Sequence, residues 1–284
     1  MPNRFVFLLA VAACAAAVGF AGLRGTGAQP FAAPPTGSAE TDVDVALVLA
    51  VDVSYSMDPD EQALQREGYV TALRSREFLD ALQHLTLGRI ALIYIEWAGV
   101  SDQKILVPWR LVDSAESAAA VADEIARAPY RRAYRTSISG GLAFAAAQLE
   151  SSPYRGRRVI DVSGDGANNQ GPPVVGVRDE LVAKGATING LPIMLKAPTP
   201  GSVDIDNLDT YYEDCVMGGP SAFVVPIKER DQFITATRTK LVLEIADRAS
   251  QPRVRRTSAE APRISCTIGE RLWQQRWGSG TDFN

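Results

Sequence analysis

One carboxylate and two hydroxyls follow an unbroken apolar run at alternate positions of the chain. The run of residues 45–51 ends in Asp52, and Ser54 and Ser56 come next at every second position. Each of these side chains offers an oxygen ligand, and hard divalent cations such as Mg²⁺ prefer oxygen ligands. The spacing therefore indicates an oxygen-lined cation site. A strand followed by a polar turn would have the same local pattern.

Two further oxygen donors lie near the ends of predicted elements. Thr136 precedes an Ala-rich helical stretch, and Asp165 follows the strand-like run 158–163 in the segment Ser-Gly-Asp-Gly. If the strands before Asp52 and Asp165 are adjacent and parallel, the two carboxylates lie roughly 5–10 Å apart at one edge of the sheet. Open α/β sheets place their functional sites at this carboxyl edge.

The elements that must position these side chains alternate between strand-like and helical patterns from Asp42 onward, which is typical of a doubly wound α/β fold. We expect a Rossmann-like, mostly parallel six-stranded sheet with helices on both faces. Its strands are predicted at residues 45–52, 89–96, 104–109, 158–163, 186–190 and 221–226. The strand at 104–109 should be an antiparallel edge, because the connection before it is too short for a crossover helix and Pro108 is tolerated at an edge.

Helical patterns fill most of the intervals between these strands. They predict helices at residues 59–85, 114–127, 142–149 and 232–248, and one after Pro173 that ends at Lys184. In the helix at 114–127, Ser114 is the expected N-cap.

The combination of these oxygen donors resembles the metal-ion-dependent adhesion site of von Willebrand factor A domains. The motif residues are Asp52, Ser54, Ser56, Thr136 and Asp165. The likeness covers about residues 42–249 in element order as well as in motif. Within that superfamily, the segments 211–215 and 223–226 look like a group of exported bacterial proteins of unknown function.

The resemblance implies that Ser54, Ser56 and Thr136 contact a divalent cation directly, while the two Asp side chains act directly or through water. One coordination position would stay open for an Asp or Glu side chain of a partner protein. Mg²⁺ is the expected cation, with Mn²⁺ or Ca²⁺ as alternatives. Gly164 departs from the family, where many members have Ser or Thr directly before the Asp, and it leaves the direction of the Asp165 side chain open.

Arginine and tyrosine side chains near the motif form a candidate partner surface. They are Tyr55, Arg131, Arg132, Tyr134 and Arg135. The arginines would attract an acidic partner and speed encounter, and the tyrosines would add aromatic contact area. The alternative is a solvated loop with ordinary surface charges.

The N-terminus has the pattern of an export signal. Arg4 provides a positive charge, residues 5–21 are almost purely apolar, and Thr26-Gly-Ala28 is a plausible cleavage site. We expect residues 1–28 to be removed and the protein to be periplasmic or secreted, without a membrane span after cleavage. Two alternatives are an uncleaved membrane anchor and a lipoprotein processed at Cys14.

The remaining organisation follows from composition. Residues 29–41 are predicted to be a flexible linker, 42–249 the folded domain and 250–284 a tail of different composition. A net charge of −4 argues against broad nucleic-acid binding. After signal cleavage Cys215 and Cys266 remain; they either pair in an oxidising compartment, which would add about 3–4 kcal/mol to stability, or are two unrelated thiols.

Two other functions compete with adhesion. The first is a hydrolase or phosphotransferase that uses Asp52 and a bound metal. The dehalogenase-type phosphotransferases need a second carboxylate where this chain has Ser54, and His84 is predicted at the opposite edge of the sheet. The second is a structural module that interacts through its tail, where Trp273 and Trp277 would share one face of a helix.

Overall fold

Five strands form a single sheet in the order β3-β2-β1-β4-β5. The computed structural model describes residues 40–198, 203–246 and 261–278. The strands are β1 (Thr41–Asp52), β2 (Ile90–Trp97), β3 (Gln103–Val112), β4 (Tyr154–Gly164) and β5 (Thr187–Pro192). All neighbouring pairs are parallel except β2 with β3, so the predicted antiparallel edge is confirmed.

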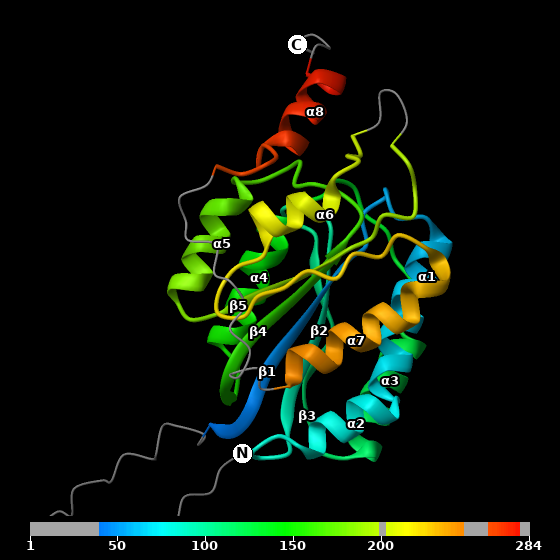
Figure 1. The fold of residues 1–284 in the computed structure, drawn as a ribbon, viewed down its shortest axis with the longest axis vertical. Helices are drawn as coiled ribbons and strands as arrows, with labels where there is room; N and C mark the ends of the chain where they lie inside the picture. Colours follow the sequence, from blue (N-terminus) through cyan, green and yellow to red (C-terminus); the bar gives the residue numbers. More distant parts are fainter. Residues whose placement is uncertain (1–39, 199–202, 247–260, 279–284) are drawn as a thin grey trace, which may run out of the picture. The chain divides into compact units, whose positions relative to one another are not determined.

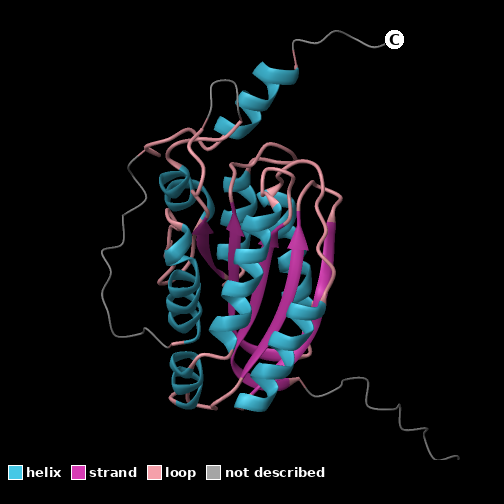
Figure 2. Cartoon of the chain, turned by 90° about the vertical axis from the view of Figure 1, so that its right-hand side faces the viewer, coloured by secondary structure: helices cyan, strands magenta, loops and turns pink. Residues whose placement is uncertain are grey.

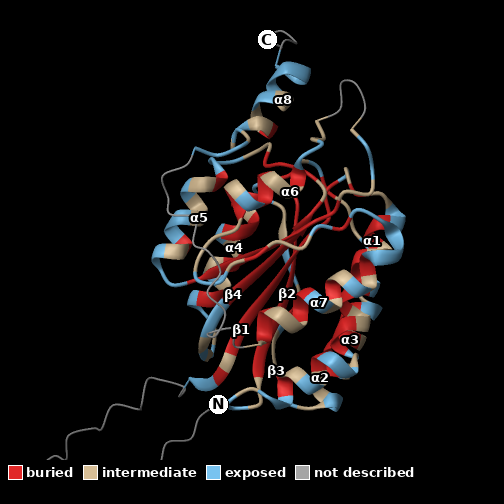
Figure 3. Cartoon of the chain, in the orientation of Figure 1, coloured by how far each residue is buried: buried red, intermediate tan, exposed pale blue. Residues whose placement is uncertain are grey.

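The central strand β1 is buried on both faces, as its apolar sequence predicts. Leu47 and Leu49 point into one apolar cluster, whereas Val48 and Ala50 point into the other. The period of two in a strand puts alternate side chains on opposite faces. Figure 3 shows the buried sheet between layers of helices whose outer surfaces are exposed.

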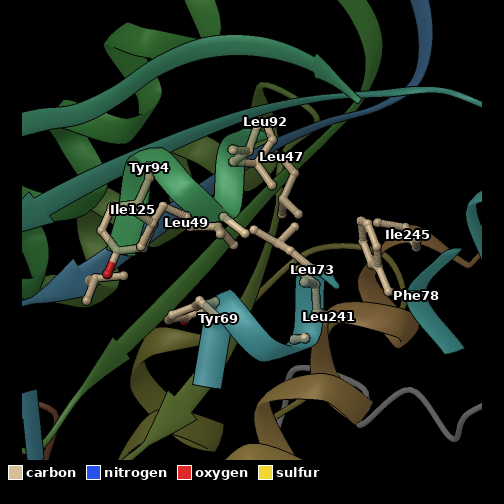
Figure 4. Close-up of a cluster of buried hydrophobic side chains, with 14 of the residues drawn as sticks. Leu47, Leu49, Tyr69, Leu73, Phe78, Leu92, Tyr94, Ile125, Leu241 and Ile245 are labelled. Atoms are coloured by element: carbon tan, nitrogen blue, oxygen red, sulfur yellow. The ribbon is translucent and has the colours of Figure 1, made fainter. Parts of the chain in front are cut away.

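Helices cover both faces of the sheet (Figures 1 and 2). Those that contribute to the first cluster are α1 (Pro59–Leu73), α2 (Arg76–Gln83), α3 (Ala115–Arg127) and α7 (Phe233–Ile245). Figure 4 shows part of this cluster, in which Leu241 of α7 lies beside Leu73 of α1. Those that contribute to the second cluster are α4 (Ile138–Glu150), α5 (Val174–Ala183), α6 (Leu208–Tyr211) and the helical turn η1 (Tyr212–Val216). The doubly wound fold class is therefore confirmed.

The predicted helix at 59–85 is in fact two helices. Ser75 separates α1 from α2 and has an extended backbone, with a ψ of 148°. Its Oγ accepts a hydrogen bond from Phe78 N at 3.2 Å and donates one to Ala72 O at 2.7 Å. A serine that caps a new helix competes with continuation of the old one.

The predicted sixth strand at 221–226 does not form. Val224 makes only an isolated bridge to Gly190 of β5, and Ser221 has a φ of +57°. Pro226 has no N–H to donate to a ladder. The segment therefore runs beside β5 without becoming a strand.

The tail contains a helix, α8 (Ile268–Trp277), that contacts the domain. The predicted signal segment lies outside the described residues. Within the described ranges, no helix has both the length and the apolar character to cross a membrane.

Candidate metal centre

Adjacent strands bring the two motif carboxylates to one edge of the sheet. β1 and β4 are parallel, and Val51 lies opposite Ser163 in their register. Asp52 ends β1, and Asp165 follows directly after β4. The predicted adjacency of these strands is therefore correct. The strand order reverses between β1 and β4, and doubly wound sheets place their sites at such a topological switch point.

The hydroxyls of the first loop lie between the two carboxylates. Asp52 Oδ1 accepts a hydrogen bond from Ser54 N at 2.7 Å. Ser54 Oγ lies 2.8 Å from Ser56 Oγ, and Ser56 Oγ donates to Asp165 Oδ1 at 2.6 Å. Four of the five motif residues thus form one continuous chain of contacts.

Thr136 joins this group through the loop before α4. Its side chain is buried beside Gly166, where an added Cβ would lie 3.8 Å from Thr136 Oγ1. Thr136 N donates to Asn169 Oδ1 at 3.0 Å, and Asn169 N donates to Thr136 O at 2.8 Å. Asn169 thereby connects the Asp165 loop to the Thr136 loop.

Gly164 leaves space for the Asp52 carboxylate. A Cβ at this position would lie 2.7 Å from Asp52 Oδ2 and 3.0 Å from Tyr212 Oη. A serine or threonine here would need one of these groups to move. Gly164 does not misdirect Asp165, because that side chain points to Ser56.

The electrostatics of the site favour a cation. Burial raises the pKa of Asp52 to about 7, and Asp52 Oδ2 has no hydrogen-bond partner among the described residues. Burial, together with the nearby Asp52 carboxylate, raises the pKa of Asp165 well above its usual range. Lys196 offsets this only in part, since it donates to Ser56 O at 2.7 Å and is ion-paired with Glu61. A divalent ion would compensate both carboxylates.

The donor set fits a hard cation. Its side chains are two carboxylates and three hydroxyls, and no cluster of three His, Cys, Asp or Glu side chains with metal-binding geometry occurs in the described parts of the chain. Oxygen donors without nitrogen or sulfur suit Mg²⁺, Mn²⁺ or Ca²⁺.

Arg131, one of the predicted partner residues, is held by ion pairs in the described structure. Its guanidinium forms an ion pair with Glu96 at 2.7 Å and another with Asp102. Glu96 is buried and also pairs with Arg66 at 3.1 Å. Arg131 therefore compensates buried charge beneath the edge of the sheet, a role that its position in the sequence does not indicate.

The other four predicted partner residues do gather at this edge, and we call them the rim surface: Tyr55, Arg132, Tyr134 and Arg135. The two tyrosine rings lie 4.5 Å apart, and 47% of Tyr55 and 77% of Tyr134 is exposed. Arg132 lies 4.8 Å from the Tyr55 ring centroid. Neither Arg132 nor Arg135 has an ion-pair partner among the described residues.

Three neighbours of the site were not predicted from the sequence. Tyr212 of η1 approaches Gly164, and its buried hydroxyl has no hydrogen-bond partner in the described structure. Glu61 and Lys196 line a cavity of about 320 Å³ that also touches Ser56 and Asp165. Only Glu61 carries a local signal, since it forms a capping box with Asp58 at the start of α1.

The structure joins Cys215 and Cys266 in a disulfide with an S–S distance of 2.06 Å. The bond connects η1, which lies near the site, to the segment that leads into α8. Cys14 lies outside the described residues.

His84 lies far from the motif residues along the sheet, as predicted. It caps the C-terminus of α2, which lies at the end of the molecule opposite α8 (Figure 1). Its ring Nδ1 is 2.6 Å from Asp80 O, and the residue is exposed. His84 therefore does not supply a general base to the motif serines.

Comparisons with known proteins agree with this fold. A family model described as "Protein of unknown function (DUF1194)" matches residues 42–249. A comparison with curated proteins finds no match.

Three solved structures illustrate the likeness. The pilus adhesin SpaC from Lactobacillus rhamnosus GG, in its open conformation, is 13% identical with a TM-score of 0.53, over 72% of this chain and 30% of the adhesin. Proximal thread matrix protein 1 from the mussel byssus is 15% identical with a TM-score of 0.52, over 72% of this chain and 49% of the matrix protein. A von Willebrand factor type A structure from Catenulispora acidiphila is 15% identical with a TM-score of 0.51, over 71% and 42% of the two chains. The present chain spans about half of these proteins or less, and the similarity establishes the von Willebrand factor A fold.

Proposed function

We propose that this chain, which belongs to the family described as "Protein of unknown function (DUF1194)", binds a divalent cation and uses it to hold a carboxylate of a partner protein. One observation carries the proposal. Asp52 and Asp165 lie with three hydroxyls at the carboxyl edge of the sheet, and Asp52 keeps a buried oxygen without a hydrogen-bond partner among the described residues.

Each motif residue has a definite part in this proposal. Ser54, Ser56 and Thr136 would hold the ion as neutral ligands, and Asp52 and Asp165 would supply the compensating charge. A bound ion supplies an electrophilic position for a carboxylate oxygen. Asp52 accepts a hydrogen bond from the backbone N–H of Ser54, and Asp165 accepts one from the Ser56 hydroxyl. The Ser54 and Ser56 hydroxyls also contact each other, so these bonds keep the two hydroxyls together. We propose Mg²⁺ as the ion, with Mn²⁺ or Ca²⁺ as alternatives.

The partner is a protein that presents an Asp or Glu side chain. The rim surface favours such a partner, because Arg132 and Arg135 carry charges that no ion pair within the described residues compensates. Arginine and tyrosine are also enriched at protein interfaces. The charge of the rim would steer an acidic partner toward the cation.

We propose binding rather than catalysis, and an exported protein rather than a cytosolic one. The motif serines form hydrogen bonds with each other and with a carboxylate, and His84 is too remote to act as their general base. The disulfide between Cys215 and Cys266 is of the kind that persists in the periplasm or outside the cell.

Affinity capture tests the proposed function. Wild-type protein and the Asp52→Asn variant are immobilised and exposed to an extract of the exported proteins, in Mg²⁺ or in chelator. Asp80→Asn is the matched control, because Asp80 is a surface carboxylate on α2 at the other end of the molecule. We expect proteins that wild type and Asp80→Asn retain in Mg²⁺ and release in chelator. Equal retention by Asp52→Asn would contradict the proposal.

A further inference from the structure

The C-terminal helix α8 is tied to the domain at several points. Cys266, two residues before the helix, is bonded to Cys215 of η1. Arg263 forms ion pairs with Glu213 and, at 2.7 Å, with Asp214. These contacts hold the segment that leads into α8 against η1, so the helix begins at a defined place on the domain.

The first turn of α8 packs on the Asp165 loop. Gly269 lies so close to Asn168 that an added Cβ would collide with the Asn168 carbonyl oxygen. Asn168 Nδ2 donates a hydrogen bond to Glu270 Oε1 at 2.8 Å. Because Asn168 is three residues after Asp165, the base of α8 adjoins the candidate metal centre.

The next turn of α8 contacts the rim surface. The guanidinium of Arg135 lies 3.5 Å from the centroid of the Trp273 ring, a cation–π distance. Arg135 directly precedes Thr136, and its φ of +75° is rare for a residue other than glycine. The residue directly before a predicted metal ligand therefore contacts a tryptophan of the tail.

The far end of α8 leaves the domain. Figures 1 and 2 show the helix extending beyond the edge of the sheet at which β1 and β4 end. Trp277 is 57% exposed, its ring lies 5.9 Å from that of Trp273, and Arg276 lies 5.4 Å from its centroid. We call Trp273, Arg276 and Trp277 the helix surface. An exposed tryptophan beside an uncompensated arginine is typical of a binding surface rather than of a packed one.

We propose that α8 is part of the partner-binding site, where the helix surface continues the rim surface and receives an acidic peptide segment of the partner. The inference rests on the proposed function, because the same segment would place one carboxylate at the cation. It adds to that function a second contact zone, outside the residues that the family model covers.

Charge complementarity identifies the occupant. Arg132, Arg135 and Arg276 have no ion pair with any described carboxylate, and all three lie against aromatic rings. Arg132 Nη2 already donates to Tyr55 O at 2.6 Å. Stacking on a ring leaves the other Nη groups of these guanidiniums able to donate to carboxylates. An acidic peptide satisfies these donors, whereas an apolar segment would bury them unpaired.

Binding of a defined acidic peptide tests the inference. The probe is a fluorescent hexaglutamate peptide in MgCl₂, with hexaglutamine as the neutral control, and anisotropy gives the Kd. The variant Arg276→Gln/Trp277→Ala changes only exposed side chains of α8. Arg76→Gln is its matched control, since Arg76 is an exposed arginine of α2 at the other end of the molecule. Calorimetric titration with MgCl₂ is performed on every protein.

We expect the double variant to bind hexaglutamate at least about fivefold more weakly than wild type and Arg76→Gln, with an unchanged Mg²⁺ affinity and melting temperature. Equal peptide affinity of the double variant and Arg76→Gln, or the absence of hexaglutamate binding by Mg²⁺-loaded wild type, would overturn the inference while the proposed function stands. Failure of wild type to bind Mg²⁺ would overturn both.

Discussion

Ser56 Oγ donates a hydrogen bond of 2.6 Å to Asp165 Oδ1 across 109 residues of sequence. This contact joins the loop after β1 to the loop after β4. It holds the Ser56 hydroxyl against the Asp165 carboxylate, whose pKa is raised by burial. The geometry of the candidate metal centre depends on it.

Ser56→Ala should therefore weaken metal binding. The variant removes one proposed ligand and leaves Asp165 Oδ1 without its hydroxyl donor. We expect Mg²⁺ affinity to fall by about tenfold or more, as measured by calorimetry. Ser151→Ala, which changes an exposed serine between α4 and β4, is the control. Equal affinities of the two variants would exclude Ser56 as a ligand.

Gly164→Ser should damage the site. Its Cβ would lie 2.7 Å from Asp52 Oδ2, so the carboxylate must shift. We expect a loss of about 1–3 kcal/mol in unfolding free energy together with weaker Mg²⁺ binding. Gly176→Ser is the matched control, because nothing lies within 4 Å of a Cβ there. Wild-type behaviour of Gly164→Ser would show that the carboxylate has room to move.

Removal of the disulfide should destabilise the domain. Cys215 and Cys266 close a loop of 51 residues, and the chain-entropy model assigns such a crosslink about 3–4 kcal/mol. The double variant Cys215→Ser/Cys266→Ser should unfold at a lower urea concentration than oxidised wild type. Reductant should lower the midpoint of wild type and leave that of the double variant unchanged. A midpoint of wild type that is insensitive to reductant would contradict the crosslink.

A buried charge cluster should make stability depend on pH. Lys240 is fully buried and forms ion pairs with both Asp161 and Glu244. One ammonium compensates one carboxylate, and burial, together with the Asp161 carboxylate, raises the pKa of Glu244 to about 8. Glu244 therefore takes up a proton on folding at neutral pH.

This proton uptake sets the sign of the dependence. Because the folded pKa of Glu244 exceeds the ordinary value of 4.5, its contribution to stability is complete below pH 4.5 and is lost as the pH rises toward 8. In saturating Mg²⁺, the unfolding free energy of wild type should fall by up to about 1.4 kcal/mol per pH unit in this range. The unfolding free energy of Glu244→Gln should fall less steeply with pH. That of Glu180→Gln, a substitution on the surface of α5, should change with pH as wild type does. Identical slopes for all three would contradict the assignment.

The parts of the fold and site that were predictable are those with local signals. The apolar run before Asp52 and the alternation of patterns predicted the sheet, and the motif predicted which oxygens would meet. The break at Ser75 and the failure of the segment 221–226 to form a strand depend on caps and single backbone angles, which composition does not reveal.

Other features depend on contacts between distant segments. Arg131 resembles its neighbours in sequence, yet it forms an ion pair with the buried Glu96 of β2. The approach of Tyr212 to Gly164 and of α8 to Arg135 also depends on tertiary packing. The only sequence signal for it was one of the two alternatives for the cysteines, a bond between Cys215 and Cys266.

Calorimetric titration of the metal-free protein with MgCl₂ and MnCl₂ tests the central claim most directly. Wild type and Asp80→Asn should bind one ion per chain, whereas Asp52→Asn should show no binding heat while its circular dichroism spectrum stays that of a folded protein. Uptake of the ion by Asp52→Asn with wild-type affinity, or the absence of uptake by folded wild type, would contradict the account.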